Sequence, residues 1–404
     1  MLTQKNIFKL TALSSVYLVW GAIASLNDLL IPYLKTQFEL NFTQAMRIQL
    51  VFYAAYFFLS LPCGYISRRY GYRNGILIGI FWAMGGCLLM LIASKSSSYN
   101  FILGSIFVLA SGITMLQVSA NPYVMTLGEE HTAPSRLTLV QSFHSLGTTI
   151  GPYFGAILIF SAATVFGSEA LTTSIPGEGI WKPYLILMII LACIALLFAK
   201  LEPESVKLNQ GAQGTGLLQL VRSNPRLIAG TLGIFFYVGA EISIASFLVN
   251  YLVKPEIAAL SYETAGKFVA VYWGLALFGR FAGAALLRRF QPGRMLGLYA
   301  VCAAGLTLFS ISSSGLLAMW SILLVGFFNS IMFPTIFALS IRDLKQDAPS
   351  ASGVLCLGIV GGAVISQAQG MLADRVGVQM AFLLPMLCYV YIAIFSIQTL
   401  KNRN

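Results

Sequence analysis

Four ionisable residues lie deep within long apolar stretches of this sequence. They are Asp28, His144, Glu241 and Arg280. A charge at the centre of a membrane helix costs about 2.5–3.5 kcal/mol on insertion scales, so such residues are functional candidates. A carboxyl group that alternates between an apolar and a wet environment takes up and releases a proton. We therefore predict that Asp28 carries a coupling proton.

The other three residues admit more than one interpretation. Glu241 is a second candidate for proton coupling, but an ion pair with Arg280 would explain both residues structurally. A histidine within a membrane is also a candidate proton relay, because its side chain titrates near neutral pH. The sequence therefore leaves open whether His144 and Glu241 take part in coupling.

Neutral polar residues follow one face of two of the apolar stretches. Gln117 and Asn121 are four residues apart and share a helix face. A second stripe repeats every three to four residues and comprises Thr138, Gln141, His144, Ser145 and Thr148. Amides and hydroxyls bind sugar hydroxyls without adding charge, although they also join helices to one another. We predict that Gln117, Asn121, Gln141 and His144 bind a sugar.

Aromatic rings near these stripes are candidates for stacking on the C–H faces of a sugar. They are Phe52, Tyr53, Tyr56, Tyr272 and Trp273. Most aromatic residues in membrane proteins pack helices or anchor them at the interface. We retain Tyr53 and Trp273 as candidate sugar contacts and add the polar residues Asn27, Gln49 and Asn329.

The composition limits the class of protein. Of 404 residues, 57% are hydrophobic and 10% are charged, with a mean hydropathy of +0.80. A soluble protein carries about 25% charged residues, so a cytosolic enzyme, a disordered regulator and a fibrous protein are excluded. The net charge of +11 comes from cations in short loops, so we expect no nucleic-acid partner. The six cysteines form no CxxC pair, and we expect no disulfide, metal site or cofactor.

The apolar stretches predict twelve transmembrane helices in an all-α membrane protein. Each is about 20 residues or longer and lacks the alternation of a membrane β-barrel. We place them near 9–35, 44–67, 74–94, 101–127, 136–164, 181–200, 226–252, 263–287, 293–312, 315–340, 350–371 and 377–399. Most lysines and arginines lie on the side of the two termini, which predicts that both termini are cytoplasmic.

The chain also divides into two similar halves. A polar stretch at 201–225 predicts a cytoplasmic linker between six-helix bundles at 1–200 and 226–404. Arg68-Arg69-Tyr70 of the first half matches Arg288-Arg289-Phe290 of the second, and Ala133-Pro134-Ser135 matches Ala348-Pro349-Ser350. Duplicated halves predict a pseudo-twofold axis along the membrane normal, with a site between the halves.

Several motifs resemble one known family. These are Leu26-Asn27-Asp28, Leu61-Pro62-Cys63-Gly64, the block from Gln117 to Gly147, Tyr237-Val238-Gly239-Ala240-Glu241 and Phe328-Asn329-Ser330-Ile331-Met332-Phe333-Pro334. The chain resembles the major facilitator superfamily and, within it, the fucose–galactose–glucose proton symporter family. The resemblance implies the major facilitator fold and proton-coupled sugar transport.

The resemblance also implies roles for single residues. Asp28 matches the proton carrier of the family, and Gln141 matches a sugar contact. Gln117 stands where fucose-type members have a glutamate; its amide binds a sugar but does not titrate, as in hexose-type members. His144 stands where the family commonly has asparagine.

We therefore expect a bacterial inner-membrane symporter that takes up a hexose-type sugar with protons by alternating access. Its partners are the sugar and the lipid bilayer, and we expect a monomer. An exporter of another small solute is an alternative, but its pocket would be more apolar than these stripes. A membrane-embedded enzyme is a second alternative, but it would need a nucleophile with a base, or a metal cluster. A channel or receptor is disfavoured by the duplicated halves.

Overall fold

The fold was analysed in a computed structural model. The structure describes residues 4–41, 44, 46–96, 98–160, 180–201 and 216–401. Within these ranges, the side chains at positions 28, 29, 32, 36, 156, 157, 159, 160 and 401 are outside the description. The described residues form helices and short connections and contain no strand. This agrees with the all-α prediction.

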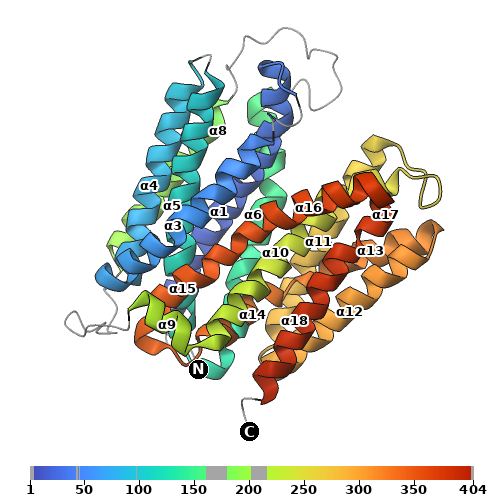
Figure 1. Cartoon of the computed structure of the whole chain (residues 1–404). Helices are drawn as coiled ribbons and strands as arrows, with labels where there is room; N and C mark the ends of the chain where they lie inside the picture. Colours follow the sequence, from blue (N-terminus) through green and yellow to red (C-terminus); the bar gives the residue numbers. More distant parts are fainter. Residues whose placement is uncertain are drawn as a thin grey trace. The chain divides into compact units, whose positions relative to one another are not determined.

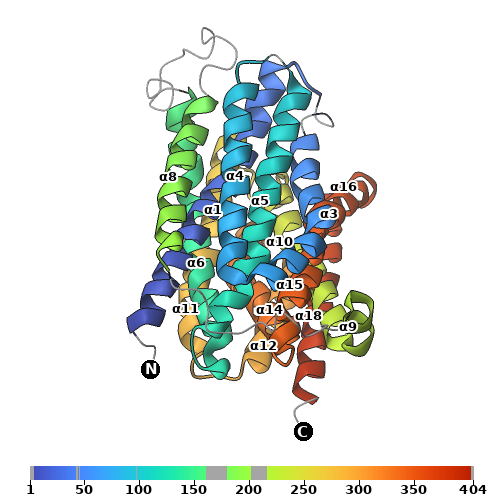
Figure 2. The ribbon, with the colours of Figure 1, turned by 90° about the vertical axis from the view of Figure 1, so that its left-hand side faces the viewer.

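The helices fall into two compact units by their contacts. Unit 1 comprises Met1–Tyr123 and Phe143–Gln210, and unit 2 comprises Val124–Ser142 and Gly211–Asn404. Unit 1 contains α1 (Gln4–Gln37), α3 (Arg47–Tyr70), α4 (Tyr72–Ala93), most of α5 (Tyr99–Thr126), the later part of α6 (Ala133–Phe160) and α8 (Trp181–Ala199). Within unit 1, α4 packs along α8 and also runs beside α5 (Figure 2).

Unit 2 contains the remaining helices. They are η1 (Glu130–Thr132), the start of α6, α9 (Leu217–Ser223), α10 (Pro225–Leu252), α11 (Tyr262–Leu286), α12 (Pro292–Ser312), α13 (Gly315–Asn329), α14 (Met332–Ile341), η2 (Lys345–Asp347), α15 (Ala348–Leu357), η3 (Gly358–Val360), α16 (Gly361–Val376), α17 (Val378–Ala381) and α18 (Leu383–Lys401). Within unit 2, α18 packs along α12, and α16 packs against α10 (Figure 1).

The predicted spans agree with the observed helices. Among the described residues, 11 helical stretches are long and apolar enough to cross a membrane. The predicted span at 136–164 corresponds to α6, a helix of 28 residues that brings the set to twelve. Residues 161–164 of that prediction, and 202–215 of the predicted linker, lie outside the described residues. The described part of the linker contains the short helix α9.

Three of the later spans are interrupted, which the hydropathy pattern did not predict. The span at 377–399 consists of α17 and α18, with Phe382 between them. The span at 315–340 consists of α13 and α14, and α13 ends at Asn329. Pro334 lacks a backbone N–H, and its ring is directed at the carbonyl of Ser330, which weakens a regular helix at this point, although α5 and α6 continue through Pro122 and Pro152. The span at 350–371 is similarly divided by the single turn η3, next to Gly361.

The repeated motifs lie in the same local structure in both halves of the sequence. Ala133 begins α6 directly after the 3-10 turn η1, and Ala348 begins α15 directly after the 3-10 turn η2. A proline is favoured at the start of a helix because its missing N–H is not needed there. The matched sequences therefore encode matched turn–helix junctions.

Glycines allow α4 and α5 of unit 1 to lie in close contact. A Cβ atom added to Gly112 of α5 would lie 2.4 Å from the main-chain nitrogen of Ala83 in α4. A Cβ atom on Gly86 of α4 would lie 2.5 Å from the main chain of Leu109 in α5. Small residues at such crossings let backbones approach closely, which provides much of the packing energy between membrane helices.

A pair of substitutions on α5 tests this contact. Gly112→Ala places a methyl group against the main chain of Ala83, which cannot move aside easily, so we expect a loss of about 1–3 kcal/mol of stability. Gly104→Ala is the matched control, because nothing lies within 4 Å of the added atom. Thermal melting in detergent should show a lower melting temperature for the first variant only. Equal melting temperatures would contradict the close contact.

Candidate functional site

The main chains of α1 and α6 approach one another closely in unit 1. A Cβ atom on Gly147 would lie 2.0 Å from the Leu18 carbonyl oxygen, and one on Gly21 would lie 2.1 Å from the His144 carbonyl oxygen. Gly151, four residues after Gly147, similarly faces Ser25 of α1. This G-x-x-x-G spacing is a helix-contact motif. It places the helix that carries Asn27 and Asp28 directly against the helix that carries His144.

The imidazole of His144 packs against an aromatic ring of α1. The ring centroids of Trp20 and His144 are 4.6 Å apart, with an angle of 62° between the rings. Trp20 is buried and His144 is half-buried. The indole therefore fixes one side of the imidazole and limits its orientations.

A second aromatic residue of α1 connects to α5. The hydroxyl of Tyr17 donates a hydrogen bond to Oδ1 of Asn121, and the rings of Tyr17 and Trp20 are 5.1 Å apart. Asn121 is fully buried and Gln117 is 4% exposed. Two of the predicted sugar contacts, Asn121 and His144, are therefore linked through neighbouring rings of α1.

Tyr17 and Trp20 were not among the predicted site residues. Both lie on the face of α1 that also presents Asn27, because the three positions are separated by three and seven residues. This spacing could have identified both aromatic residues as neighbours of Asn27 from the sequence alone. Neither side-chain polar atom of the buried Asn27 has a hydrogen-bond partner among the described residues. The Asp28 side chain lies outside the described residues.

The two candidates on α3 are half-buried. Gln49 and Tyr53 are four residues apart on one face of this helix. The ring of Tyr53 packs edge-on against Phe52, with 6.0 Å between the centroids. Their position leaves part of each side chain accessible, as a binding residue requires.

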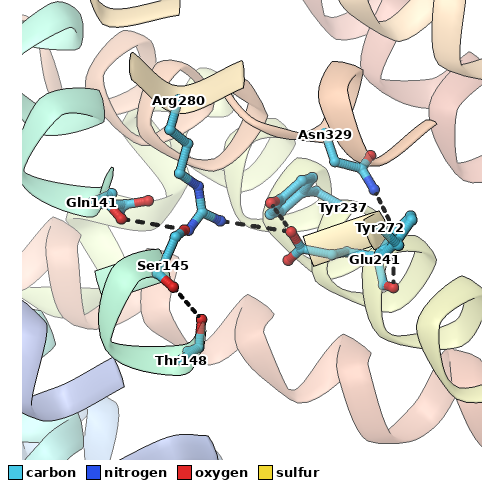
Figure 3. Close-up of polar contacts among 8 residues, drawn as sticks. All are labelled: Gln141, Ser145, Thr148, Tyr237, Glu241, Tyr272, Arg280 and Asn329. Atoms are coloured by element: carbon cyan, nitrogen blue, oxygen red, sulfur yellow. Dashed lines mark hydrogen bonds and ion pairs between the residues drawn. The ribbon is translucent and has the colours of Figure 1, made fainter. Parts of the chain in front are cut away.

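Unit 2 contains a buried network around Glu241 (Figure 3). Tyr237, one helical turn earlier on α10, donates a hydrogen bond of 2.7 Å to Oε1 of Glu241. Nη2 of Arg280 on α11 lies 3.6 Å from the same oxygen, and both side chains are at most 10% exposed. The ion pair between Glu241 and Arg280, one of the two interpretations drawn from the sequence, is therefore present.

The network extends to the helix break after α13. Nδ2 of Asn329 donates a 2.7 Å hydrogen bond to the hydroxyl of Tyr272, which in turn donates to the main-chain oxygen of Glu241 at 3.4 Å. Trp273 is half-buried, and its ring lies 5.4 Å from that of Tyr272. The predicted candidates Glu241, Trp273 and Asn329 are thus brought together by Tyr272.

Gln141 also belongs to this network, through its main chain. It lies in the start of α6, which groups with unit 2, and its side chain is buried. Nη1 of Arg280 donates to the Gln141 carbonyl oxygen at 3.4 Å (Figure 3). Arg280 therefore bridges a predicted sugar contact and a predicted proton-coupling residue.

Comparison with known proteins identifies the family. The model of the Major Facilitator Superfamily matches residues 13–367. The chain belongs to this superfamily. A Brucella abortus protein named glucose/galactose transporter is 46% identical over 396 residues, covering 98% of this chain and 95% of the relative. The L-fucose-proton symporter of Escherichia coli is 32% identical, covering 98% of this chain and 93% of the relative.

Solved structures of the superfamily agree with the fold. The crystal structure of the major facilitator superfamily transporter FucP in the outward conformation aligns with a TM-score of 0.86 at 30% identity, covering 98% of this chain and 99% of that one. The resemblance drawn from the sequence motifs is therefore confirmed. This chain is a multi-pass membrane transporter of the superfamily and not an enzyme.

The described residues contain no cluster of three or more histidine, cysteine or acidic side chains that would hold a metal. All six cysteines are free thiols, and four of them are buried. The polar groups that the described structure offers to a substrate are thus amides, hydroxyls, an imidazole and the Glu241–Arg280 pair.

Tyr272→Phe tests the connection between Asn329 and Glu241. The variant lacks the hydroxyl that accepts from Asn329, so a buried amide loses a partner at a cost of about 1–3 kcal/mol. We expect a lower melting temperature in detergent. Tyr262→Phe is the control on the same helix, because Tyr262 is 71% exposed. Equal melting of the two variants would contradict a structural role for the Tyr272 hydroxyl.

Proposed function

We propose that this transporter takes up a hexose-type sugar together with protons by alternating access. The observation that supports this most strongly is the neutral polar group of unit 1, in which the buried amide of Asn121 on α5 is hydrogen-bonded to Tyr17 of α1 and His144 packs against Trp20. Amides supply donors and acceptors to sugar hydroxyls, and rings offer apolar faces. The 46% identity to a glucose/galactose transporter favours a hexose as substrate.

The proposed sugar contacts come from both units. In unit 1 they are Asn27, Gln49, Tyr53, Gln117, Asn121 and His144. In unit 2 they are Gln141, Trp273 and Asn329. Gln117 is an uncharged amide and cannot exchange a proton at neutral pH. In this proposal it binds sugar, and proton transfer takes place elsewhere.

Asp28 is the proposed proton carrier. It is an acid within a long apolar helix, where neutralisation by a proton removes the cost of a charge in a dry environment. His144 and Glu241 are further candidates for coupling. The proton-coupled relative in Escherichia coli supports a proton as the coupling ion. The transporter needs no other cofactor in this proposal.

We further propose the placement of the chain in its membrane. The distribution of lysines and arginines favours cytoplasmic termini and a cytoplasmic linker at 201–225. The relatives favour the inner membrane of a bacterium. The halves at 1–200 and 226–404 would be the parts that move in alternating access, and a monomer suffices for this mechanism.

Uptake by proteoliposomes tests the coupling. An inward proton gradient should drive accumulation of labelled glucose or galactose by the wild-type protein. Asp28→Asn should abolish accumulation and preserve sugar exchange without a gradient, because the amide cannot carry a proton. Asp343→Asn is the control, because Asp343 is an exposed acid in a surface ion pair. Accumulation that persists in Asp28→Asn would contradict the coupling role.

Substitution of the amides tests the sugar site. Gln117→Ala and Gln141→Ala each remove one polar contact to a hydroxyl, so we expect KM to rise about tenfold, equivalent to about 1.4 kcal/mol. Gln219→Ala on α9 is the control, because this amide is exposed. The measurement is initial uptake rate against sugar concentration. Unchanged KM values in both site variants would rule out this set of sugar contacts.

A further inference from the structure

The start of α6 is attached to α11 within unit 2 by contacts on three successive turns. The hydroxyl of Ser135 donates a 2.6 Å hydrogen bond to the Ala284 carbonyl oxygen, and both residues are buried. One turn later, Thr138 faces Gly283, whose added Cβ atom would lie 4.0 Å from the threonine methyl group. The third contact is that of Arg280 with the Gln141 carbonyl oxygen.

The hydrogen bond of Ser135 is neutral and short, whereas the contact of Arg280 with Gln141 depends on a charge. At 3.4 Å, the bond from Arg280 to Gln141 is long for an N–H···O hydrogen bond. The guanidinium is held from its other side by the Glu241 carboxylate, whose position is fixed in turn by Tyr237. The contact with Gln141 therefore depends on the ion pair behind it.

A buried ion pair of this kind does little for net stability. Removing two charges from water costs several kcal/mol for each ion, and replacing both partners by well-packed hydrophobic residues of similar volume is often neutral or stabilising. Removing only one partner leaves an uncompensated charge, which is strongly destabilising. The main effect of this pair is therefore to fix the position of the Arg280 guanidinium, and with it the main chain of Gln141 that the guanidinium contacts.

We propose that Arg280 is a positioning residue for Gln141. The negative charge of Glu241 anchors the guanidinium, and the guanidinium holds the Gln141 turn of α6 on α11. Loss of the charge on Glu241 releases this turn, so the state of a buried acid on α10 changes the position of a sugar-binding residue on α6. The link to sugar binding rests on the role proposed above for Gln141.

A cysteine at position 138 reports directly whether the turn is held. Thr138 is fully buried, and its hydroxyl donates to the Pro134 carbonyl oxygen of its own helix, so Thr138→Cys removes neither hydrogen bond between α6 and α11. The measurement is the rate of maleimide labelling in detergent, with Cys193→Ser and Cys302→Ser in the background to remove the exposed and the half-buried native thiols. We expect slow labelling in this parent protein.

Arg280→Gln and Glu241→Gln should each speed labelling of Cys at 138 about tenfold, because either change removes the anchor of the turn. Arg226→Gln is the matched control, since Arg226 also forms an ion pair, with Asp343 at 2.9 Å, and neither partner lies on α6 or α11. Labelling as slow in Arg280→Gln as in the parent would overturn the proposal.

The double variant Glu241→Met with Arg280→Met separates positioning from stability. It buries no charge, so its melting temperature should return close to that of the wild type. Labelling should stay as fast as in the single variants. The Kd for sugar should be about tenfold higher than that of the wild type, in the double variant as in the single variants. If the double variant restores slow labelling together with the melting temperature, the pair is only structural and the proposal is wrong.

The labelling assay needs no sugar. A wild-type protein that transports no hexose would contradict the proposed function, while the labelling rates would still test the role of Arg280. Conversely, normal hexose uptake by the wild type with unchanged labelling in the variants would contradict only the positioning role.

Discussion

The structure depends on the absence of water from the bilayer core. Each backbone N–H and C=O group must find its partner within the protein, and a helix provides that partner locally. This constraint explains why a chain with 10% charged residues folds into helices and short connections throughout its described part. It also explains why each polar side chain within a helix needs a partner or a function. The short list of such residues is therefore informative.

Close packing then determines which polar residues meet. Lipid gives helices no hydrophobic reason to associate, so van der Waals contact at small residues contributes a large share of the energy. The glycines of α6 bring its main chain onto α1, and this contact sets the His144 ring against Trp20. The arrangement of this part of the candidate site thus follows from a packing motif, and a bulky residue at Gly147 would displace it.

The sequence predicted the helices, their faces and the family, but not the partners across helices. Periodicity placed Gln117 and Asn121 on one face because the repeat of a helix is fixed. It did not reveal that Tyr17 bonds to Asn121, because the rotation of α1 against α5 is set by tertiary contacts. The break after Asn329 was missed for another reason: hydropathy is averaged over a window of residues and does not register a local change of backbone geometry. The roles of Asp28 and the sugar contacts stay predictions.

The buried polar residues of the two units have different kinds of partner, and this difference suits two different functions. In unit 1 the described contacts of Asn121 and His144 are with a hydroxyl and an aromatic ring, which suits a neutral ligand with many hydroxyls. In unit 2 a buried acid and a guanidinium share a network with Tyr237, Tyr272 and Asn329. A sugar does not require such charges, and stability is not their main consequence. In a transporter such charges can position other groups. The charge of Glu241 holds the Arg280 guanidinium, and the guanidinium in turn positions the group that it contacts. In this chain that contact is the main chain of Gln141.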